Sequence, residues 1–336
     1  MLGALVAGFI VLTGVAFGVL SGSQNSLGPR LLVVNQGDKT VSVVDPATNS
    51  QVAVIDEHQT TMHGHEVAVG PDGRIAYLPI YGNVGVGSPG LDGTEMLAID
   101  IATGDIVGRV NFGHGVRPHC VVYSAATGML YVTTELDNSI TIVDPKTLKI
   151  VGAIPTAQEQ SHMLAVTRNG RRGYTANVSP GSVSVLDMVK RKTIAVIPIS
   201  NVTQRIALST DDKWVFTSDQ TMPRLAAIDT KTNKIAKWID LPGTGYGTAA
   251  TPDGKWLLLP IPGKAVVAVI DLKTLTLARI IGVEKAPQEM LVRPDGKFAY
   301  VASSATKKVC VIDLTLWKMT TTIDVGNNPD GLAWAD

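Results

Sequence analysis

The sequence predicts an all-β protein, a seven-bladed β-propeller of four-stranded antiparallel blades. Short runs rich in β-branched and aromatic residues alternate with turn residues, which is the pattern of strands. No helical periodicity is visible after residue 30. An aspartate that ends a β-branched run recurs at intervals of 55, 44, 43, 42, 42 and 42 residues. A repeat of this length is typical of a propeller blade. Seven such aspartates predict seven blades: Asp45, Asp100, Asp144, Asp187, Asp229, Asp271 and Asp313.

Residues 129–154 show the repeat most clearly. Strands are predicted over 130–134, 139–143 and 149–154, with Asp137 and Asn138 in the first turn and Asp144 opening the second. The Asp144 carboxylate is able to accept backbone N–H bonds inside its tight turn. We therefore expect the recurring aspartate to be structural.

The two ends of the repeat are predicted to close the ring together. Residues 30–56 hold three strands without a preceding inner strand, whereas residues 330–334 resemble an inner strand. The C-terminal strand should join the N-terminal three, which removes an exposed sheet edge. Residues 29–336 are then one domain, because each blade buries its faces only against its neighbours.

Residues 1–28 are predicted to be a signal peptide or a membrane anchor. Residues 1–20 are apolar and uncharged, and small polar residues follow at 21–25. Such a run indicates an export signal or a membrane span, although no Lys or Arg precedes it here. We expect an exported protein that is periplasmic, secreted or membrane-anchored and facing outside.

Charge and cysteine content limit the partners and the chemistry. The chain has 29 Lys and Arg against 29 Asp and Glu, so no basic face is implied and no nucleic-acid partner is expected. Cys120 and Cys310 are the two cysteines, and they lie in different blades of the predicted repeat. A disulfide needs Cα atoms within about 7 Å, so we expect two separate buried thiols.

One blade carries an insertion. The usual spacing from the second strand to the next anchor aspartate is 13 residues, as from Tyr131 to Asp144, but it is 23 from Tyr77 to Asp100. The ten extra residues fall in the loop GNVGVGSPGLDGTE. Loops that outgrow a rigid repeat often carry function. The segment is predicted to be either a functional lid or a neutral surface insertion.

The repeat resembles a known family. The stretches YVTTELDNSITIVDPKTLKIVGAI and AYVASSATKKVCVIDLTLWKMTTTIDVG resemble the YVTN family of β-propeller repeats, and the resemblance covers about residues 30 to 336. It implies the propeller fold. It leaves the function open among exported proteins of unknown role, lactonase-like enzymes, and haem- or quinone-linked redox proteins, because fold alone does not choose among them.

The start of each inner strand should face the central channel. Counting back about eight residues from the turn that ends each inner strand aligns one residue per blade, and every one is polar or aromatic. Gln204, Tyr246 and Gln288 are predicted to contact a ligand. The aligned positions are His65, His119, His162, Gln204, Tyr246, Gln288 and Asp330.

Three histidines in consecutive blades share that position, and they predict a metal site. Imidazoles of His65, His119 and His162 converging on one divalent cation suit zinc, copper or manganese sites. The alternative is that each His only hydrogen-bonds a neighbouring loop. Glu66 and Glu135 are predicted acid/base groups, and the sequence places Arg117 and Arg205 where they could hold an anion; these four are the predicted catalytic residues.

The sequence thus supports an exported propeller that binds a small-molecule ligand or a protein partner at its channel mouth, through a three-His divalent metal site. Two alternatives remain open. One is a metal-dependent lactonase-like hydrolase or a lyase, in which the metal polarises a carbonyl or activates water. The other is a haem- or quinone-handling redox protein with a His as axial ligand. Whether the protein is an enzyme stays open.

Overall fold

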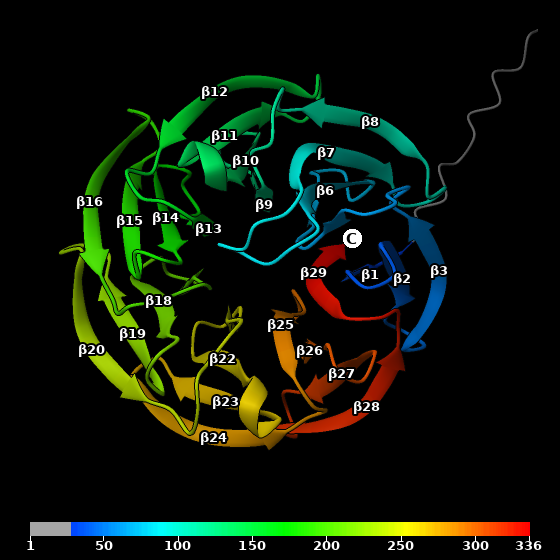
Figure 1. Cartoon of the computed structure of the whole chain (residues 1–336). Helices are drawn as coiled ribbons and strands as arrows, with labels where there is room; N and C mark the ends of the chain where they lie inside the picture. The colour runs from blue at the N-terminus through cyan, green and yellow to red at the C-terminus, as the bar shows by residue number, and fades with distance from the viewer. Residues whose placement is uncertain (1–27) are drawn as a thin grey trace, which may run out of the picture.

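The computed structural model describes residues 28–336, which form a closed ring of seven antiparallel sheets around a channel (Figure 1). The predicted seven-bladed propeller is therefore confirmed. The predicted signal peptide or anchor lies outside the described residues, apart from Gly28. Among residues 28–336, none of the helical segments has the length and apolar character that crossing a bilayer requires.

The blades follow one another around the ring, each running from an inner to an outer strand. Blade 1 contains β29 (Pro329–Ala335), β1 (Arg30–Asn35), β2 (Thr40–Asp45) and β3 (Ser50–Asp56). Blade 2 contains β4 (His63–Gly64), β5 (Ala68–Val69), β6 (Ile75–Gly82), β7 (Asp92–Asp100) and β8 (Ile106–Asn111). Blade 3 contains β9 (Pro118–Ser124), β10 (Met129–Thr134), β11 (Ser139–Asp144) and β12 (Lys149–Pro155).

The other four blades repeat this plan. Blade 4 contains β13 (Ser161–Val166), β14 (Arg172–Asn177), β15 (Ser182–Asp187) and β16 (Lys192–Pro198). Blade 5 contains β17 (Ala207–Leu208), β18 (Trp214–Asp219), β19 (Arg224–Asp229) and β20 (Lys234–Asp240). Blade 6 contains β21 (Ala249–Ala250), β22 (Trp256–Ile261), β23 (Val266–Asp271) and β24 (Thr276–Gly282). Blade 7 contains β25 (Pro287–Val292), β26 (Phe298–Ser303), β27 (Lys308–Asp313) and β28 (Lys318–Asp324). Two short 3-10 turns, η1 (Glu135–Asp137) and η2 (Pro262–Lys264), follow β10 and β22.

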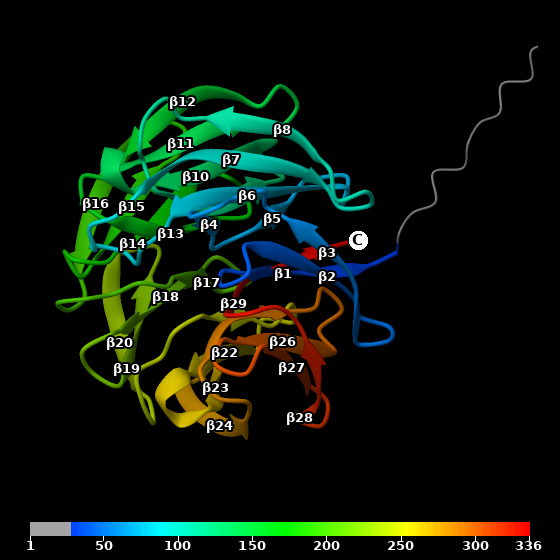
Figure 2. The same ribbon diagram turned by 45° about the vertical axis from the view of Figure 1, so that its right-hand side comes forward.

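The ring closes as the sequence predicts. The C-terminal strand β29 pairs antiparallel with β1, with Trp334 opposite Leu31 and Leu332 opposite Val33. Figure 2 shows the two terminal strands side by side. First and last strands of the described chain therefore share one blade, and the ring holds no free edge between them.

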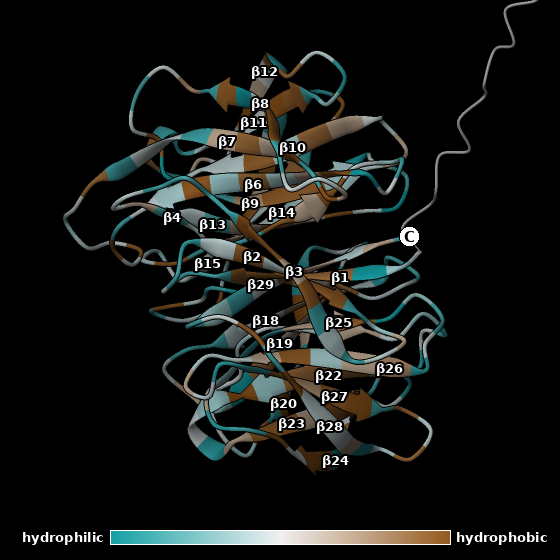
Figure 3. Ribbon diagram, turned by 90° about the vertical axis from the view of Figure 1, so that its right-hand side faces the viewer, coloured by the Kyte–Doolittle hydropathy of each residue, from teal (hydrophilic) through white to brown (hydrophobic). Residues whose placement is uncertain are grey.

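The apolar core lies between blades. Seven buried clusters each combine side chains from two neighbouring blades, as where Leu32 and Val43 of blade 1 meet Leu78 and Leu97 of blade 2. Figure 3 shows apolar residues on strands throughout the ring, where they alternate with polar residues. Each blade depends on its neighbours for burial, so closing the ring completes the core.

The recurring aspartate is structural, as expected. In blade 3 the Oδ1 atom of Asp144 accepts the backbone N–H of Lys146 at 2.9 Å, and in blade 7 Asp313 accepts that of Thr315 at 2.7 Å. The hydrogen bond from Lys146 lowers the pKa of Asp144. Cys120 and Cys310 are separate buried thiols, also as expected.

Candidate functional site at the channel mouth

A cavity of about 240 Å³ lies at the mouth of the channel. The structure gathers all seven aligned positions around it, one from each blade. Gln36, Asn328 and Pro329 from neighbouring turns, Gly85 and Val86 from the insertion, and Arg205 complete the lining. The aligned residues are His65, His119, His162, Gln204, Tyr246, Gln288 and Asp330.

β-bulges in the inner strands aim two successive residues at the channel. In blade 3 the pairing shifts so that His119 and Cys120 both lie opposite Thr133. Blades 7 and 1 have the same shift, at 288–289 and at 330–331. A bulge inserts one extra residue and redirects side chains locally. In these three blades the aligned residue lines the cavity, whereas the residue after it, such as Cys120 or Glu289, does not.

Three imidazoles form one side of the cavity. The ring centroids of His65 and His119 are 5.0 Å apart, and those of His119 and His162 are 3.6 Å apart. Among the described residues, Nε2 of His65 and both ring nitrogens of His119 are buried without a hydrogen-bond partner. Burial holds the pKa of each of these two imidazoles well below its usual range, so both are neutral at pH 7. Their nitrogens are available to bond a ligand.

The third imidazole is held by a buried carboxylate. Nδ1 of His162 bonds the Oε1 atom of Glu135, whose side chain is 1% exposed. The other carboxylate oxygen accepts the hydroxyl of Tyr81 at 2.8 Å. Burial, and then the Glu135 charge, raise the pKa of Tyr81 far above its usual range. Tyr81 is therefore a hydrogen-bond donor to Glu135 at every pH at which the protein would be studied.

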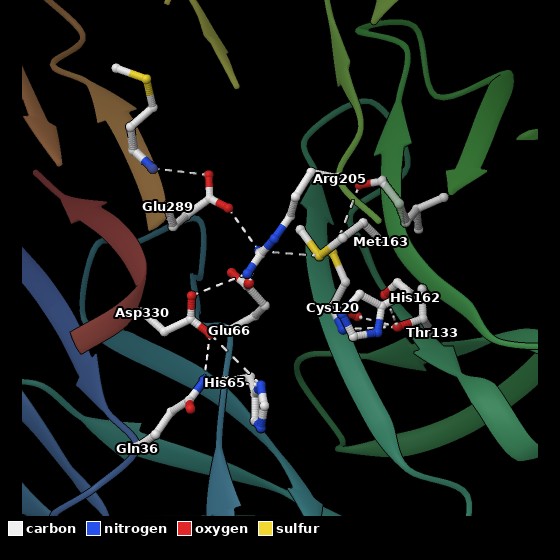
Figure 4. A network of polar contacts seen from close by, with 12 residues as sticks. Gln36, His65, Glu66, Cys120, Thr133, His162, Met163, Arg205, Glu289 and Asp330 are labelled. Atoms are coloured by element: carbon white, nitrogen blue, oxygen red, sulfur yellow. Dashed lines mark hydrogen bonds and ion pairs between the residues drawn. The ribbon is translucent and has the colours of Figure 1, made fainter. Parts of the chain in front are cut away.

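Arg205, which also lines the cavity, is enclosed by three carboxylates from other blades (Figure 4). Its guanidinium bonds Glu66, Glu289 at 2.7 Å and Asp330 at 3.1 Å. Burial raises the pKa of Glu66 to about 8, even though the Arg205 charge opposes the shift, and burial also raises the pKa of Glu289. The cluster therefore holds a proton at neutral pH, and the Arg205 charge is already balanced by the protein's own acids.

The insertion covers the cavity. Residues 83–91, which we call the roof segment, reach from β6 and β7 over the mouth in Figure 1, and Gly85 and Val86 touch the cavity. Arg117 fastens the segment, because its Nε donates to Asp92 at 2.6 Å and its Nη2 to the carbonyl of Ser88 at 2.7 Å. A Cβ on Gly93 would stand 1.7 Å from the carbonyl oxygen of Ile80, so only glycine fits at the base.

The predicted site residues therefore occupy different places. The three histidines and Gln204, Tyr246 and Gln288 line the cavity. Glu66 and Glu135 stand behind it and bond other side chains. Arg117 and Arg205 bond the protein's own carboxylates, so their predicted anion-holding role stays a prediction. Within residues 28–336, no three or more His, Cys, Asp or Glu side chains are arranged to hold a metal ion.

Three residues of the site were not predicted from the sequence: Glu289, Gln36 and Tyr81. The sequence nevertheless carried a signal for each of them. Glu289 follows the aligned Gln288 just as Glu66 follows His65. Gln36 and Tyr81 share one repeat position with Glu135. The equivalent second-strand residues are Leu32, Tyr77 and Tyr131. Four residues after them come Gln36, Tyr81 and Glu135 respectively.

Comparison with known proteins adds a family. The family described as "Cytochrome D1 heme domain" matches residues 124–336. "Uncharacterized protein YncE" of Salmonella typhi is 24% identical over 165 residues, which is 45% of this chain and 46% of that protein. Its counterpart in Escherichia coli O157:H7 is 25% identical over 163 residues, 44% of this chain and 46% of that protein. The chain spans about half the length of the curated relatives it matches.

Three solved structures share the fold. "Kuenenia stuttgartiensis Hydrazine Synthase" matches with a TM-score of 0.71 and 19% identity, over 84% of this chain and 92% of that one. "Dihydro-heme d1 dehydrogenase NirN in complex with DHE" has a TM-score of 0.65 and 15% identity, over 90% and 74%. A functionally unknown protein from Desulfotomaculum acetoxidans DSM 771 has a TM-score of 0.75 and 11% identity, over 91% and 98%. At these identities the likeness concerns the fold alone.

Proposed function

The chain belongs to the cytochrome D1 heme domain family, and we propose that it binds a metal centre at the channel mouth through neutral imidazoles. The centre is either the iron of a haem-type tetrapyrrole, as the family suggests, or a single zinc, copper or manganese ion, as the three-histidine pattern suggests. Both share one chemistry, since a neutral imidazole nitrogen is a common ligand of each.

One observation carries the proposal. The imidazoles of His65, His119 and His162 line one side of the channel-mouth cavity. Three buried nitrogens of His65 and His119 have no partner among the described residues. Buried polar atoms normally have a partner, and leaving one without costs about 1–3 kcal/mol. A metal centre in the cavity would relieve part of that penalty, through a bond to His119 or through the waters that it carries.

Imidazole nitrogen is a suitable ligand for both forms of the centre, but within residues 28–336 no three or more His, Cys, Asp or Glu side chains are arranged to hold an ion, so a single ion needs side chains to move. The available space also distinguishes the two forms. Small-molecule pockets are usually about 300–1,000 Å³, and the cavity of about 240 Å³ lies below that range. A single ion with its waters fits beneath the roof segment as it stands. A tetrapyrrole fits only when the roof segment lifts, which requires Arg117 to release Ser88 and Asp92. Bound iron would supply redox chemistry or an open coordination position at the mouth.

The hydrolase or lyase alternative receives less support. It requires Glu66 or Glu135 to act as acid or base toward a substrate in the cavity. Neither of them lines the cavity, and their carboxylates bond Arg205 and the Tyr81–His162 pair respectively. Both are better placed to position other groups than to exchange protons with a substrate. Export and a protein partner at the channel face remain predictions from the sequence.

Two titrations of the purified protein test the proposal. Adding haemin should give an intense visible absorption band at a stoichiometry of about one, or adding Zn²⁺, Cu²⁺ or Mn²⁺ should raise the melting temperature by mass action. His119→Ala and His162→Ala should weaken whichever response appears. His58→Ala and His114→Ala are matched controls, because both side chains are exposed and lie away from the cavity. No response to either probe, or equal responses in all four variants, would contradict the proposal.

A further inference from the structure

We infer that Glu135 and Tyr81 are positioning residues that hold His162 in the tautomer with its hydrogen on Nδ1, which makes Nε2 of His162 the metal-binding nitrogen of the channel mouth. The inference rests on the proposed metal-binding function. It separates the three histidines, which the sequence pattern treats as equivalent.

The directions of the hydrogen bonds around Glu135 determine which nitrogen of His162 carries the hydrogen. Tyr81 donates its hydroxyl hydrogen to Oε2 at 2.8 Å. Oε1 of the same carboxylate faces Nδ1 of His162, and a carboxylate oxygen is a hydrogen-bond acceptor, so we assign the shared hydrogen to Nδ1. In a neutral imidazole the other nitrogen is then an acceptor. Nε2 of His162 therefore keeps its lone pair, and no described residue bonds it.

His65 is held the opposite way. The amide nitrogen of Gln36 donates to the carboxylate of Asp330 at 2.5 Å, and the amide oxygen accepts from Asn328 at 2.8 Å, so the amide can face in one direction only. That same nitrogen lies 3.0 Å from Nδ1 of His65, which must therefore accept. Nε2 of His65 then carries a hydrogen and cannot bond a metal without a change of tautomer.

The repeat explains why two histidines at one position differ. Gln36, Tyr81 and Glu135 share one repeat position at the end of the second strand of their blades. Gln36 and Glu135 come directly after β1 and β10, and Tyr81 is the next-to-last residue of β6. Gln36 of blade 1 contacts His65 of blade 2, and Glu135 of blade 3 contacts His162 of blade 4. Each second strand thus presents one residue to the histidine of the next blade. A carboxamide there fixes one tautomer, and a carboxylate fixes the other.

His119 has the blade 2 residue, Tyr81, as its neighbour, and their ring centroids are 5.2 Å apart in a T-shaped arrangement. Neither nitrogen of His119 has a hydrogen-bond partner among the described residues, so its tautomer is not fixed. Its ring packs on that of His162 at 3.6 Å between centroids. His119 therefore supports the His162 ring, and can add a second nitrogen ligand once its ring turns.

The substitution Glu135→Gln tests the assignment sharply. Tyr81 keeps its donor role and bonds the amide oxygen, so the amide NH₂ faces Nδ1 of His162. Nδ1 must then accept, the hydrogen moves to Nε2, and the metal-binding lone pair is lost. Removing an outer partner of a ligating histidine typically weakens metal binding about 10–100-fold, and we expect a loss of that size for Zn²⁺. Adding Tyr81→Phe frees the amide to turn its oxygen to His162, so the double variant should regain part of the affinity.

Two measurements on the full chain decide the outcome. Nitrogen NMR of ¹⁵N-histidine-labelled, metal-free protein reports which nitrogen of His162 carries hydrogen. Calorimetric titration with Zn²⁺ reports affinity. Asp137→Asn is the matched control, since it alters an exposed His–Asp pair, with His114, on the same turn. Melting temperatures within a few degrees of the parent protein show that each variant is folded.

The expected results are hydrogen on Nδ1 of His162 in the parent protein, hydrogen on Nε2 in Glu135→Gln, and recovery in the double variant. Hydrogen on Nε2 of His162 in the parent protein overturns the inference whether or not Zn²⁺ binds. So does a Glu135→Gln variant that binds Zn²⁺ as tightly as Asp137→Asn does. Hydrogen on Nδ1 in a parent protein that binds none of haemin, Zn²⁺, Cu²⁺ and Mn²⁺ overturns the proposed function and leaves the tautomer assignment intact.

Discussion

Removing Arg205 should be among the most destabilising single substitutions in this protein. The Arg205 side chain is 2% exposed and bonds three carboxylates from other blades. Arg205→Ala leaves Glu66, Glu289 and Asp330 buried together without a cation. Taking one partner from a buried ion pair costs about 3–5 kcal/mol. A folded domain has about 5–15 kcal/mol in all, so the variant should lose a large share of its stability.

The stability lost in Arg205→Ala should depend on pH, and the buried acids of the cluster determine whether the loss is larger at high or at low pH. Burial already raises the pKa of Glu66 to about 8 with Arg205 present. Without that charge, Glu66 and Glu289 should take up protons at higher pH than before. An acid whose pKa is higher in the folded than in the unfolded protein lowers the stability as pH rises between the two values, by about 1.4 kcal/mol for each pH unit. Arg205→Ala should therefore be more destabilising at pH 8 than at pH 5. Combining it with Glu66→Gln should recover part of the loss at pH 8.

Urea denaturation at pH 5 and pH 8, followed by circular dichroism, measures both effects as shifts in the midpoint. Arg109→Ala is the control, because it breaks a pair with Glu95 in which Arg109 is 43% exposed, and exposed pairs contribute about 0–1 kcal/mol. An Arg205→Ala variant no less stable than Arg109→Ala, or one with equal losses at both pH values, would refute this account of the cluster.

Three further predictions concern other parts of the ring. Burial raises the pKa of Glu57 to about 7, so this acid lowers the stability of the fold as pH rises from about 4.5 to 7. Glu57→Gln should remove that part of the pH dependence. Parallel curves of stability against pH for the variant and the parent protein would contradict this prediction. Deleting 329–336 removes strand β29 and the burial of Leu332 and Ala333. At about 25 cal/mol per Å² of apolar area, the free energy of unfolding should fall by several kcal/mol. An unchanged melting temperature would show that β29 is not needed for closure. Replacing the roof segment 83–91 by a two-residue turn should leave the fold intact, since loop length has a small effect, and should speed Zn²⁺ release in stopped-flow experiments. Unchanged release kinetics would make the segment a neutral insertion.

The fold could be predicted because it repeats at short range. The aspartate turns and β-branched strands recur every 42 to 55 residues, and each can be identified from a few consecutive residues. The same periodicity aligned one residue per blade, and the structure places those seven residues around one cavity. A repeat position in a closed ring is also a position in space, so this step needed no knowledge of long-range contacts.

Contacts across the channel could not be predicted in the same way. Glu66 and Glu289 meet Arg205 although they are 139 and 84 residues away from it in sequence. The bulge at 288–289 sets the direction of Glu289, and no local sequence pattern marks it. The different tautomers of His65 and His162 could not be predicted either, because they depend on contacts with Gln36 and Glu135 of the preceding blades.

Anomalous X-ray diffraction from crystals loaded with zinc or haem iron tests the central claim most directly. We expect one anomalous peak in the channel-mouth cavity, within bonding distance of Nε2 of His162, which is about 2.0–2.1 Å for zinc. The peak should disappear in crystals of His162→Ala. A peak confined to exposed side chains such as His58 or His114, or none in the cavity at full loading, would contradict a metal centre at the channel mouth.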